Sequence, residues 1–182
     1  MSSKFINWFY NLIGPSEEIK YDRRATDNPT IEIGVYKIDQ VATLPTKAHT
    51  DAFEDAAYDL YAIDNILLQS NERLMVDTKL AFIIPEGYWI KLRERSGLAN
   101  KGIHVLGGVI DSGYTGSVRV ILFNSDKEPL ILPKGKALAQ FTIEKLTKST
   151  VKELTFLAFD REMKKRLRGQ KGFGSSDVKT NK

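Results

Sequence analysis

The sequence predicts an all-β protein, and three observations lead to this prediction. Short apolar segments rich in branched residues recur along most of the chain. Turn signals that contain proline and glycine separate these segments, for example Pro85-Glu86-Gly87 and Pro133-Lys134-Gly135. The 182 residues, of which 42% are apolar and 27% charged, are enough for one domain with a substantial core. Many short strands joined by regular turns are typical of a β-sandwich, a jelly roll or a barrel.

The strand pattern begins near residue 31, where apolar and polar side chains start to alternate. The expected strands cover residues 31–36, 80–84, 88–92, 118–123, 130–132 and 137–143. A helical segment is expected over residues 159–167, which are rich in Lys, Arg and Glu. The Gly/Ser-rich tail from Gly169 to Lys182 is expected to be flexible on its own.

The first thirty residues differ in character from the rest. Four apolar residues recur at helical spacing and predict a short amphipathic helix: Phe5, Trp8, Phe9 and Leu12. Gly14-Pro15 ends the helix, and residues 16–30 form a polar linker. Such a helix could pack on its own domain or on a neighbouring subunit, or it could contact a protein partner or a membrane surface. We therefore divide the chain into an N-terminal extension (residues 1–30), a β core (residues 31–160) and a C-terminal arm (residues 161–182).

Composition narrows the possible functions. The net charge of +4 is too small to indicate nucleic-acid binding, and it fits an anionic small ligand equally well. The chain has no cysteine, which excludes disulfides and thiolate metal sites, and its two histidines disfavour a histidine-based zinc site. No apolar run approaches the roughly 20 residues that span a bilayer. We therefore expect no membrane span and no direct nucleic-acid binding.

The segment from Gly108 to Gly116 carries the most chemical information. A carboxylate, Asp111, and an aromatic ring, Tyr114, lie three residues apart in a glycine-containing turn. The apolar pair Val109-Ile110 leads into the turn, and residues 118–123 lead out of it, so we predict a β-hairpin. Backbone N–H and C=O groups, a ring and an acid suit a pocket for a planar base attached to a sugar. Asp111 could act as a general base, although a solvated Asp and a core Tyr would explain the same residues.

Two further segments could bind phosphate and a metal ion. Asp59 stands in an apolar strand context and is either a structural carboxylate satisfied by backbone amides or an acid that holds a hydrated divalent cation. In Arg95-Ser96-Gly97, a small hydroxyl residue followed by glycine could begin a helix whose N–H groups attract phosphate. Arg95 would add a bidentate donor.

The last two segments lie further along the chain. Gln140 interrupts an apolar strand, so its amide either makes a hydrogen bond in the core or contacts a ligand phosphate. Residues 168–176 combine a cation, three glycines, a ring and two hydroxyls. They form either an unstructured tail or a tail that orders over a bound nucleotide, because glycines let backbone amides approach phosphates.

These five segments, in this order, resemble the five motifs of the trimeric dUTP pyrophosphatase (dUTPase, deoxyuridine 5'-triphosphate nucleotidohydrolase) family, over about residues 31–176. The resemblance implies a jelly-roll-like subunit of the β-clip type and a homotrimer with three active sites between subunits. In that arrangement the C-terminal motif of one subunit closes over a site built by the others. The implied reaction converts dUTP to dUMP and pyrophosphate with Mg²⁺. It limits uracil incorporation into DNA and supplies dUMP for thymidylate synthesis, in the cytoplasm of the cell or of a viral host.

The resemblance also implies a role for individual residues. Asp111 would activate the water that attacks the α-phosphorus, Tyr114 would exclude a 2′-hydroxyl, and Asp59 would hold Mg²⁺ through a water. The uracil would contact the backbone of Gly108, Val109 and Ile110. The residues implied in phosphate binding are Arg95, Ser96, Gly97, Gln140, Arg168, Gly174, Ser175 and Ser176, and Phe173 would lie over the uracil.

Two other functions remain open at this point. A dCTP deaminase would share the fold, but its chemistry requires a glutamate in the pyrimidine pocket, and the sequence offers no matching glutamate. A regulatory module that binds a protein partner is the other alternative, and the aromatic N-terminal extension supports it. One departure from the family pattern concerns Glu94, because a carboxylate beside Arg95 would weaken phosphate binding if it pointed inward.

Overall fold

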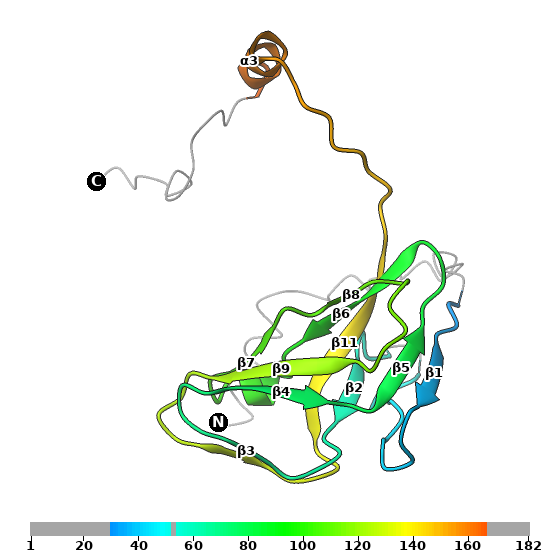
Figure 1. The fold of residues 1–182 in the computed structure, drawn as a ribbon, viewed down its shortest axis with the longest axis vertical. Coiled ribbons are helices and arrows are strands. Elements are labelled where there is room, and N and C mark those ends of the chain that lie inside the picture. The colour runs from blue at the N-terminus through cyan, green and yellow to red at the C-terminus, as the bar shows by residue number, and fades with distance from the viewer. Residues whose placement is uncertain (1–29, 52–53, 167–182) are drawn as a thin grey trace, which may run out of the picture. The chain divides into compact units, whose positions relative to one another are not determined.

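The computed structural model describes residues 30–51 and 54–166, and its described part consists mostly of β-strands (Figure 1), which confirms the all-β prediction. The strands are β1 (Gly34–Lys37), β2 (Tyr58–Tyr61), β3 (Ile66–Leu68), β4 (Arg73–Asp77), β5 (Leu80–Ile83), β6 (Tyr88–Arg93), β7 (Ile103–Leu106), β8 (Val109–Ile110), β9 (Arg119–Asn124), β10 (Leu130–Leu132) and β11 (Ala137–Lys145). The described helices are α2 (Ser96–Ala99) and α3 (Phe156–Lys164).

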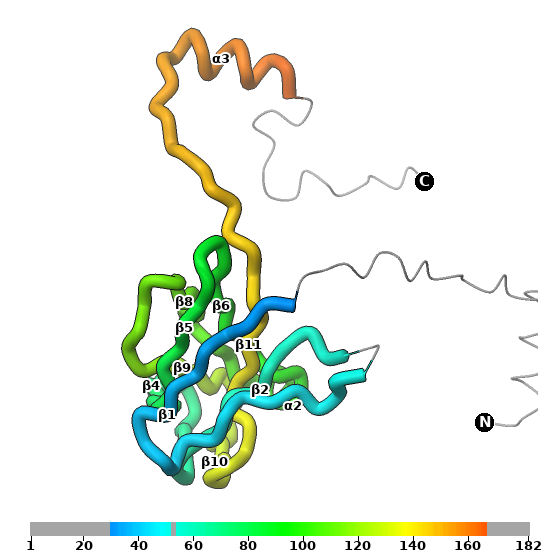
Figure 2. The backbone as a smooth tube through the Cα atoms, turned by 90° about the vertical axis from the view of Figure 1, so that its right-hand side faces the viewer, coloured from blue at the N-terminus to red at the C-terminus, as the bar shows by residue number. Residues whose placement is uncertain are grey.

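The strands form two larger sheets and two strand pairs. One sheet has the order β2-β11-β6-β8 and the other the order β4-β9-β7, while β1 pairs with β5 and β10 with β3. The second sheet and both pairs are antiparallel, as are the β11–β2 and β6–β8 pairings. Figure 2 traces the same strands after a rotation by 90°. This arrangement of short antiparallel strands in several sheets matches the jelly-roll-like architecture that the sequence predicts.

Both larger sheets contribute side chains to one hydrophobic core. The fully buried residues include Leu60 of β2, Ile90 of β6 and Leu122 of β9. The alternation of buried and exposed positions along β6 and β9 gives each strand one face toward this core. The only buried polar residues among those described are Thr78 and Asn124, and both side chains make hydrogen bonds. Both buried polar side chains therefore have hydrogen-bond partners, and the core can hold the surface loops in place.

The predicted hairpin around Asp111 differs from the structure in its strand pairing. Val109 and Ile110 form β8, which pairs with β6, whereas β9 pairs with β4 and β7. The strand that leads into the hairpin is β7, and residues 107–118 connect β7 to β9. We call these residues the β7–β9 connection. The prediction was wrong because it paired two apolar segments that are neighbours in the sequence. In the structure, the turn between them leads from β8 in one sheet to β9 in the other.

Several elements agree with the sequence prediction, and others were missed. The strands β5, β6, β9, β10 and β11 overlap the expected ranges, but β3, β4 and β7 were not predicted. The expected C-terminal helix exists and begins three residues earlier, at Phe156. Thr155 determines this start, because its side chain accepts a hydrogen bond from the Ala158 N–H at 3.3 Å.

The chain divides into two compact units, residues 1–144 and 145–182. The predicted N-terminal helix and the residues of the last motif lie outside the described residues. None of the helices found in the described part of the chain combines the length and apolarity that a bilayer crossing requires.

Candidate active site

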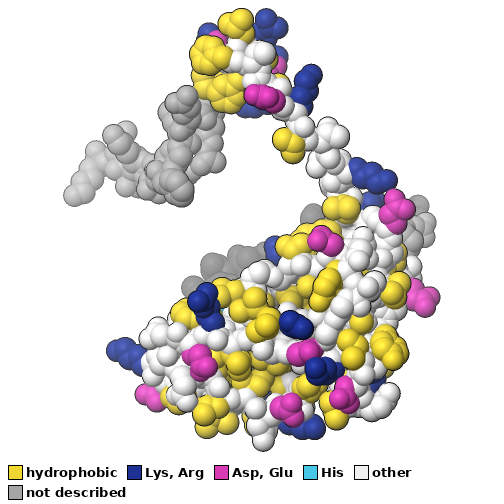
Figure 3. All heavy atoms as spheres, in the orientation of Figure 1, with side chains coloured by type: hydrophobic (Ala, Val, Ile, Leu, Met, Phe, Trp, Pro, Cys, Tyr) yellow, Lys and Arg dark blue, Asp and Glu magenta, His cyan; other side chains and the backbone are white. Residues whose placement is uncertain are grey.

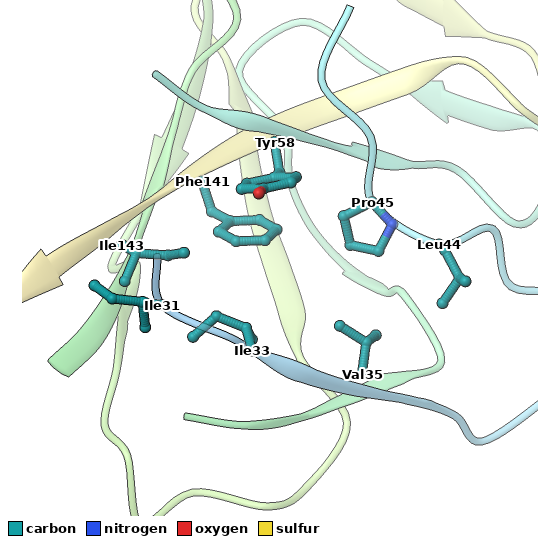
Figure 4. Close-up of a pocket in the computed structure, with 8 residues that line it drawn as sticks. All are labelled: Ile31, Ile33, Val35, Leu44, Pro45, Tyr58, Phe141 and Ile143. Atoms are coloured by element: carbon teal, nitrogen blue, oxygen red, sulfur yellow. The ribbon is translucent and has the colours of Figure 1, made fainter. Parts of the chain in front are cut away.

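Two cavities of the strand-bearing unit differ in their chemistry. One, of about 350 Å³, is apolar and is lined by Ile31, Ile33, Val35, Leu44, Pro45, Tyr58, Phe141 and Ile143 (Figure 4). The rings of Tyr58 and Phe141 stack there with centroids 5.3 Å apart. The other, of about 520 Å³, is polar and is lined by Thr46, Ala48, Asp55, Ala56, Ala57, Asp59, Arg93, Arg95, Gln140 and Thr142. Of these two cavities, only the polar one offers cations and an amide for an anionic ligand.

Three of the predicted site residues meet in the polar cavity. Asp59 lies on β2, Gln140 on β11 and Arg95 two residues after the end of β6. These three strands are neighbours in one sheet. Asp59 and Gln140 are directly opposite each other in the β2–β11 pairing. The sheet therefore brings together residues that lie 81 positions apart in the sequence.

The three side chains are held by specific contacts. The Arg95 Nε donates to the Asp59 Oδ1 at 2.8 Å, so this carboxylate is paired with a cation rather than with backbone amides. The Gln140 Nε2 donates to the backbone oxygen of Glu94 at 2.6 Å. Gln140 thus has the hydrogen bond that a half-buried amide requires, and it also fixes the backbone just before Arg95.

Ser96 and Gly97 form the first turn of α2, as the sequence predicts. The N–H groups of Leu98 and Ala99 both donate to the Arg95 backbone oxygen at 2.9 Å. Ser96 and Gly97 are exposed, and no neighbouring atom lies within 4 Å of the position a Gly97 Cβ would take. The helix begins beside the cavity with space above its first residues.

Glu94, the departure from the family pattern, is turned toward β7. Its Oε1 accepts a hydrogen bond from the Val105 N–H at 3.0 Å. Its own backbone amide lowers the pKa of Glu94, and the Val105 amide adds to this effect against the opposing effect of burial. The Glu94 carboxylate therefore connects the segment before Arg95 to β7.

Sequence reasoning missed two charged residues of the polar cavity. Arg93 donates to the Thr142 hydroxyl and to the Glu144 carboxylate, both at 3.2 Å. Asp55 accepts the backbone N–H groups of Ala48 and His49, and the His49 contacts lower its pKa. Arg93 could have been found from the sequence, because it lies two residues before Arg95 and strand side chains of that spacing share a face.

The β7–β9 connection places the predicted base-binding backbone at the edge of a sheet. β8 is the last strand of its sheet, and the Leu92 N–H donates to the Gly108 oxygen at 2.8 Å. Gly108 has a φ of 97°, and a Cβ there would lie 3.1 Å from the Leu92 oxygen. Only glycine suits this conformation and this close approach. The outer edge of β8 presents its backbone groups away from the sheet.

Asp111 and Tyr114 lie together beyond β8. The Tyr114 N–H donates to the Asp111 oxygen at 3.0 Å, and both side chains are exposed. The Tyr114 hydroxyl donates to the Ser117 oxygen at 2.9 Å. Its ring lies directly over Gly116, where an added Cβ would come within 2.6 Å of the Tyr114 hydroxyl.

The predicted site residues therefore fall into two groups and a remainder. Asp59, Arg95 and Gln140 line the polar cavity, and Ser96 and Gly97 follow Arg95 in α2, whereas no residue of the β7–β9 connection lines the cavity. The remaining predicted residues lie outside the described residues: Arg168, Phe173, Gly174, Ser175 and Ser176.

The polar cavity suits a metal ion that arrives with a phosphate ligand. Within residues 30–51 and 54–166, no three or more His, Asp or Glu side chains gather to hold a metal ion by themselves. Two carboxylates, Asp55 and Asp59, line the cavity, and Asp59 is the one in contact with Arg95. Mg²⁺ is commonly bound through one or two carboxylates together with substrate phosphates, and it keeps several waters. The donor set fits this mode.

Charges are mixed on the face drawn in Figure 3, where Lys/Arg and Asp/Glu side chains are interspersed. The formal charge of +4 is thus not gathered into one basic surface on this face. The polar cavity follows the same pattern, because Arg93 and Arg95 are each paired with a carboxylate.

A carboxylate next to the β7–β9 connection gives the protein a defined acid sensitivity. Burial pushes the pKa of Asp77 upward, but hydrogen bonds from Lys79 and Ser117 outweigh this effect and lower the pKa from 3.8 to about 2. A lowered pKa stabilises the fold above the unfolded value, here by about 2 kcal/mol at neutral pH. This stabilisation is lost as the pH falls from about 4 through 2.

We expect Asp77→Asn to lower the free energy of unfolding by about 2 kcal/mol at pH 7 and by almost nothing near pH 2. Urea unfolding of both proteins across this pH range measures the difference. A difference that stays constant with pH would contradict the assignment of the lowered pKa to Asp77.

The family comparison agrees with this fold. The dUTPase family model matches residues 42–177, and the chain belongs to the dUTPase family. The deoxyuridine 5'-triphosphate nucleotidohydrolase of Fowlpox virus is 38% identical over 149 residues, which cover 81% of this chain and 99% of the viral protein. The enzyme of the same name from Saccharomyces cerevisiae is 38% identical over 136 residues, covering 74% of this chain and 87% of the yeast protein.

The solved structures of similar fold include dUTPases of staphylococcal phages. The Staphylococcus bacteriophage 80alpha dUTPase with dUPNHPP has a TM-score of 0.67 and 27% identity, and the match covers 82% of this chain and 100% of the phage chain. A mutant dUTPase of phage phi11 of S. aureus, described for its coordination of a structural Mg(II) ion, has a TM-score of 0.61 and 23% identity. That match covers 68% of this chain and 96% of the other.

Proposed function

We propose that this protein hydrolyses dUTP to dUMP and pyrophosphate through the attack of water on the α-phosphorus. The meeting of Asp59, Arg95 and Gln140 in one polar cavity supports the proposal most directly. Relatives that are 38% identical carry the name deoxyuridine 5'-triphosphate nucleotidohydrolase. The reaction would limit uracil incorporation into DNA and supply dUMP for thymidylate synthesis.

The polar cavity would hold the triphosphate. Arg95 would exchange part of its contact with Asp59 for a phosphate oxygen, and the exposed N–H groups of Ser96 and Gly97 would add hydrogen bonds. Gln140 would contribute its amide from the opposite strand. Hydrolysis of a phosphoanhydride requires charge neutralisation and a fixed water, and very little covalent chemistry from the protein.

The β7–β9 connection would hold the base and the sugar. The outer edge of β8 offers the backbone of Gly108, Val109 and Ile110 to the uracil. Tyr114 would lie beneath the deoxyribose and leave no room for a 2′-hydroxyl. Asp111, three residues before it, would accept a proton from the attacking water.

A homotrimer would join these two groups of residues into one site. No residue of the β7–β9 connection lines the cavity that contains Asp59, so each subunit would supply the phosphate half of one site and the base half of another. The C-terminal arm would complete the site, with Arg168, Ser175 and Ser176 on the outer phosphates and Phe173 over the uracil. Gly174 would let the backbone approach the phosphates.

Mg²⁺ would be held by Asp59 through a water. When it is bound to the triphosphate, the ion neutralises phosphate charge and orients the chain of phosphates. Arg95 remains within reach of the same carboxylate at 2.8 Å and would balance its charge when the ligand leaves.

The organisation of the chain follows from this function. The β core of residues 31–160 would build the site, the arm of residues 161–182 would close it, and the extension of residues 1–30 would serve a separate purpose. Its apolar segment from Phe5 to Ile13 makes a protein partner a reasonable target. The reaction would take place in the cytoplasm, or in the host cytoplasm if the protein is viral.

The test is pyrophosphate release from dUTP, dCTP, dTTP and UTP with Mg²⁺, with ammonia release followed in parallel. We expect pyrophosphate from dUTP alone, because the site would select both the uracil base and the deoxyribose sugar. Ammonia from dCTP would establish the deaminase instead. Absence of product from all four nucleotides would contradict an enzymatic role.

A further inference from the structure

We propose that Asp77 is a positioning residue that sets the sugar selectivity of the site by fixing Ser117 and, through it, Tyr114. The inference rests on the proposed function, in which Tyr114 excludes the 2′-hydroxyl. Asp77 belongs to none of the five sequence motifs. It also contacts none of the polar-cavity side chains that would bind phosphate.

The ring of Tyr114 has few partners. It is 44% exposed, and its hydroxyl donates to the backbone oxygen of Ser117 at 2.9 Å. Gly116 leaves room for the ring, because a Cβ there would lie 2.6 Å from the Tyr114 hydroxyl. The position of Ser117 therefore decides where the tip of the ring lies.

Ser117 is held in turn by the β4–β5 turn. Its hydroxyl donates to the Asp77 Oδ1, and its neighbour Val118 accepts the Thr78 hydroxyl at 2.7 Å. The Val118 N–H also donates to the Leu80 oxygen at 2.8 Å. The β4–β5 turn thus fixes both ends of the peptide unit that receives the Tyr114 hydroxyl.

Asp77 is itself rigidly placed. Its Oδ1 accepts the Lys79 N–H at 2.9 Å, and its Oδ2 accepts the Lys79 Nζ at 2.8 Å. Lys79 adopts a left-handed φ of 55°, a conformation uncommon for a non-glycine residue, and these two bonds maintain it. A continuous series of contacts therefore runs from Lys79 through Asp77 and Ser117 to Tyr114.

This series matters for selectivity because the 2′-hydroxyl is a small group. A ring that moves by a fraction of an ångström would admit the extra oxygen of a ribonucleotide. Losing the Asp77 carboxylate would remove the bond that holds Ser117 through its side chain, and the Ser117 backbone oxygen that accepts the Tyr114 hydroxyl would shift. The effect would fall on the discrimination between dUTP and UTP, while the phosphate-binding residues stay in place.

The experiment compares the ratio of kcat/KM for dUTP to that for UTP in four variants. Asp77→Ala and Ser117→Ala should each lower the ratio roughly fivefold, the effect of one net hydrogen bond. Asp77→Asn keeps an acceptor for Ser117 and should retain the ratio within about twofold. The double variant Asp77→Ala/Tyr114→Phe should discriminate no worse than Tyr114→Phe alone, because both changes break the same series.

Stability separates a positioning role from a merely structural one. Asp77→Asn loses the ion pair with Lys79 and should become less stable while it keeps its selectivity. Asp39→Ala is the matched control, because Asp39 also accepts the N–H of the residue two positions later, Val41, and has no contact in this series. If Asp77→Ala loses stability and keeps the wild-type ratio, the proposal is overturned.

A second measurement is independent of turnover. In protein labelled with ¹³C-tyrosine, the Tyr114 ring signal is assigned by its loss in Tyr114→Phe. This signal should shift and broaden in Asp77→Ala and in Ser117→Ala, and it should stay unchanged in Asp39→Ala. An unchanged signal in Asp77→Ala would overturn the positioning role. A wild-type protein that releases no pyrophosphate from dUTP would overturn the proposed function, and the ring signal would still decide whether Asp77 positions Tyr114.

Discussion

Replacing Asp111 with Asn is expected to reduce kcat for dUTP about 1,000-fold, in the range that removal of a general base produces. The amide keeps the shape of the side chain but cannot accept a proton from water. Because Asp111 is exposed and its backbone already holds the turn through Tyr114, the fold should not change. Single-turnover pyrophosphate release measures the chemical step directly.

Binding and a matched control distinguish this role from others. Calorimetric titration with dUpNHpp should give a Kd within about threefold of the wild-type value, because the variant loses basicity and not shape. Asp64→Asn, a change at another exposed aspartate, should turn over normally. Near-normal turnover in Asp111→Asn would remove Asp111 as the base.

Deleting residues 168–182 is expected to lower kcat/KM for dUTP about 100-fold, because the arm that excludes water and clamps the outer phosphates is lost. The described β core is complete before residue 146, so the truncated protein should fold and assemble as the full chain does. Thermal unfolding and sedimentation report on folding and on assembly, and steady-state kinetics report on the site.

A shorter deletion serves as the control. Removing residues 177–182 leaves Arg168 and the Gly-rich motif through Ser176 in place, and we expect this variant to retain activity. Full activity after the longer deletion would show that the arm does not take part in the reaction. Dissociation or unfolding after that deletion would give the arm a structural role instead.

The sequence predicted the fold class because the fold class depends on local signals. Proline and glycine indicated the turns, and short segments rich in branched apolar residues indicated most of the strands. The meeting of Asp59, Arg95 and Gln140 was implied by the family resemblance, and the structure places all three in one cavity. The prediction that Ser96 and Gly97 begin a helix also held, since the small residues lie where the chain leaves β6.

The strand pairing could not be predicted because it depends on contacts between distant segments. Nothing local shows that Val109 and Ile110 pair with β6 and not with the strand that follows the turn. β4 was missed because Arg73 and Asp77 at its ends give it a polar appearance, although both lie opposite residues of β9. The same cause hid the part played by Asp77, whose partner Ser117 lies 40 residues away.

The backbone character of the β8 edge limits how this protein can evolve. If the uracil is read by main-chain groups from Gly108 to Ile110, the donors and acceptors offered to the base are the same whatever side chains those positions carry. A single substitution could then crowd or enlarge the surroundings of the base, but it could not exchange a donor for an acceptor. Gly108 is also confined to glycine by its φ of 97° and by its approach to Leu92. Single substitutions would therefore change the base preference very little. A relative that binds another base would need a different position of the β8 backbone.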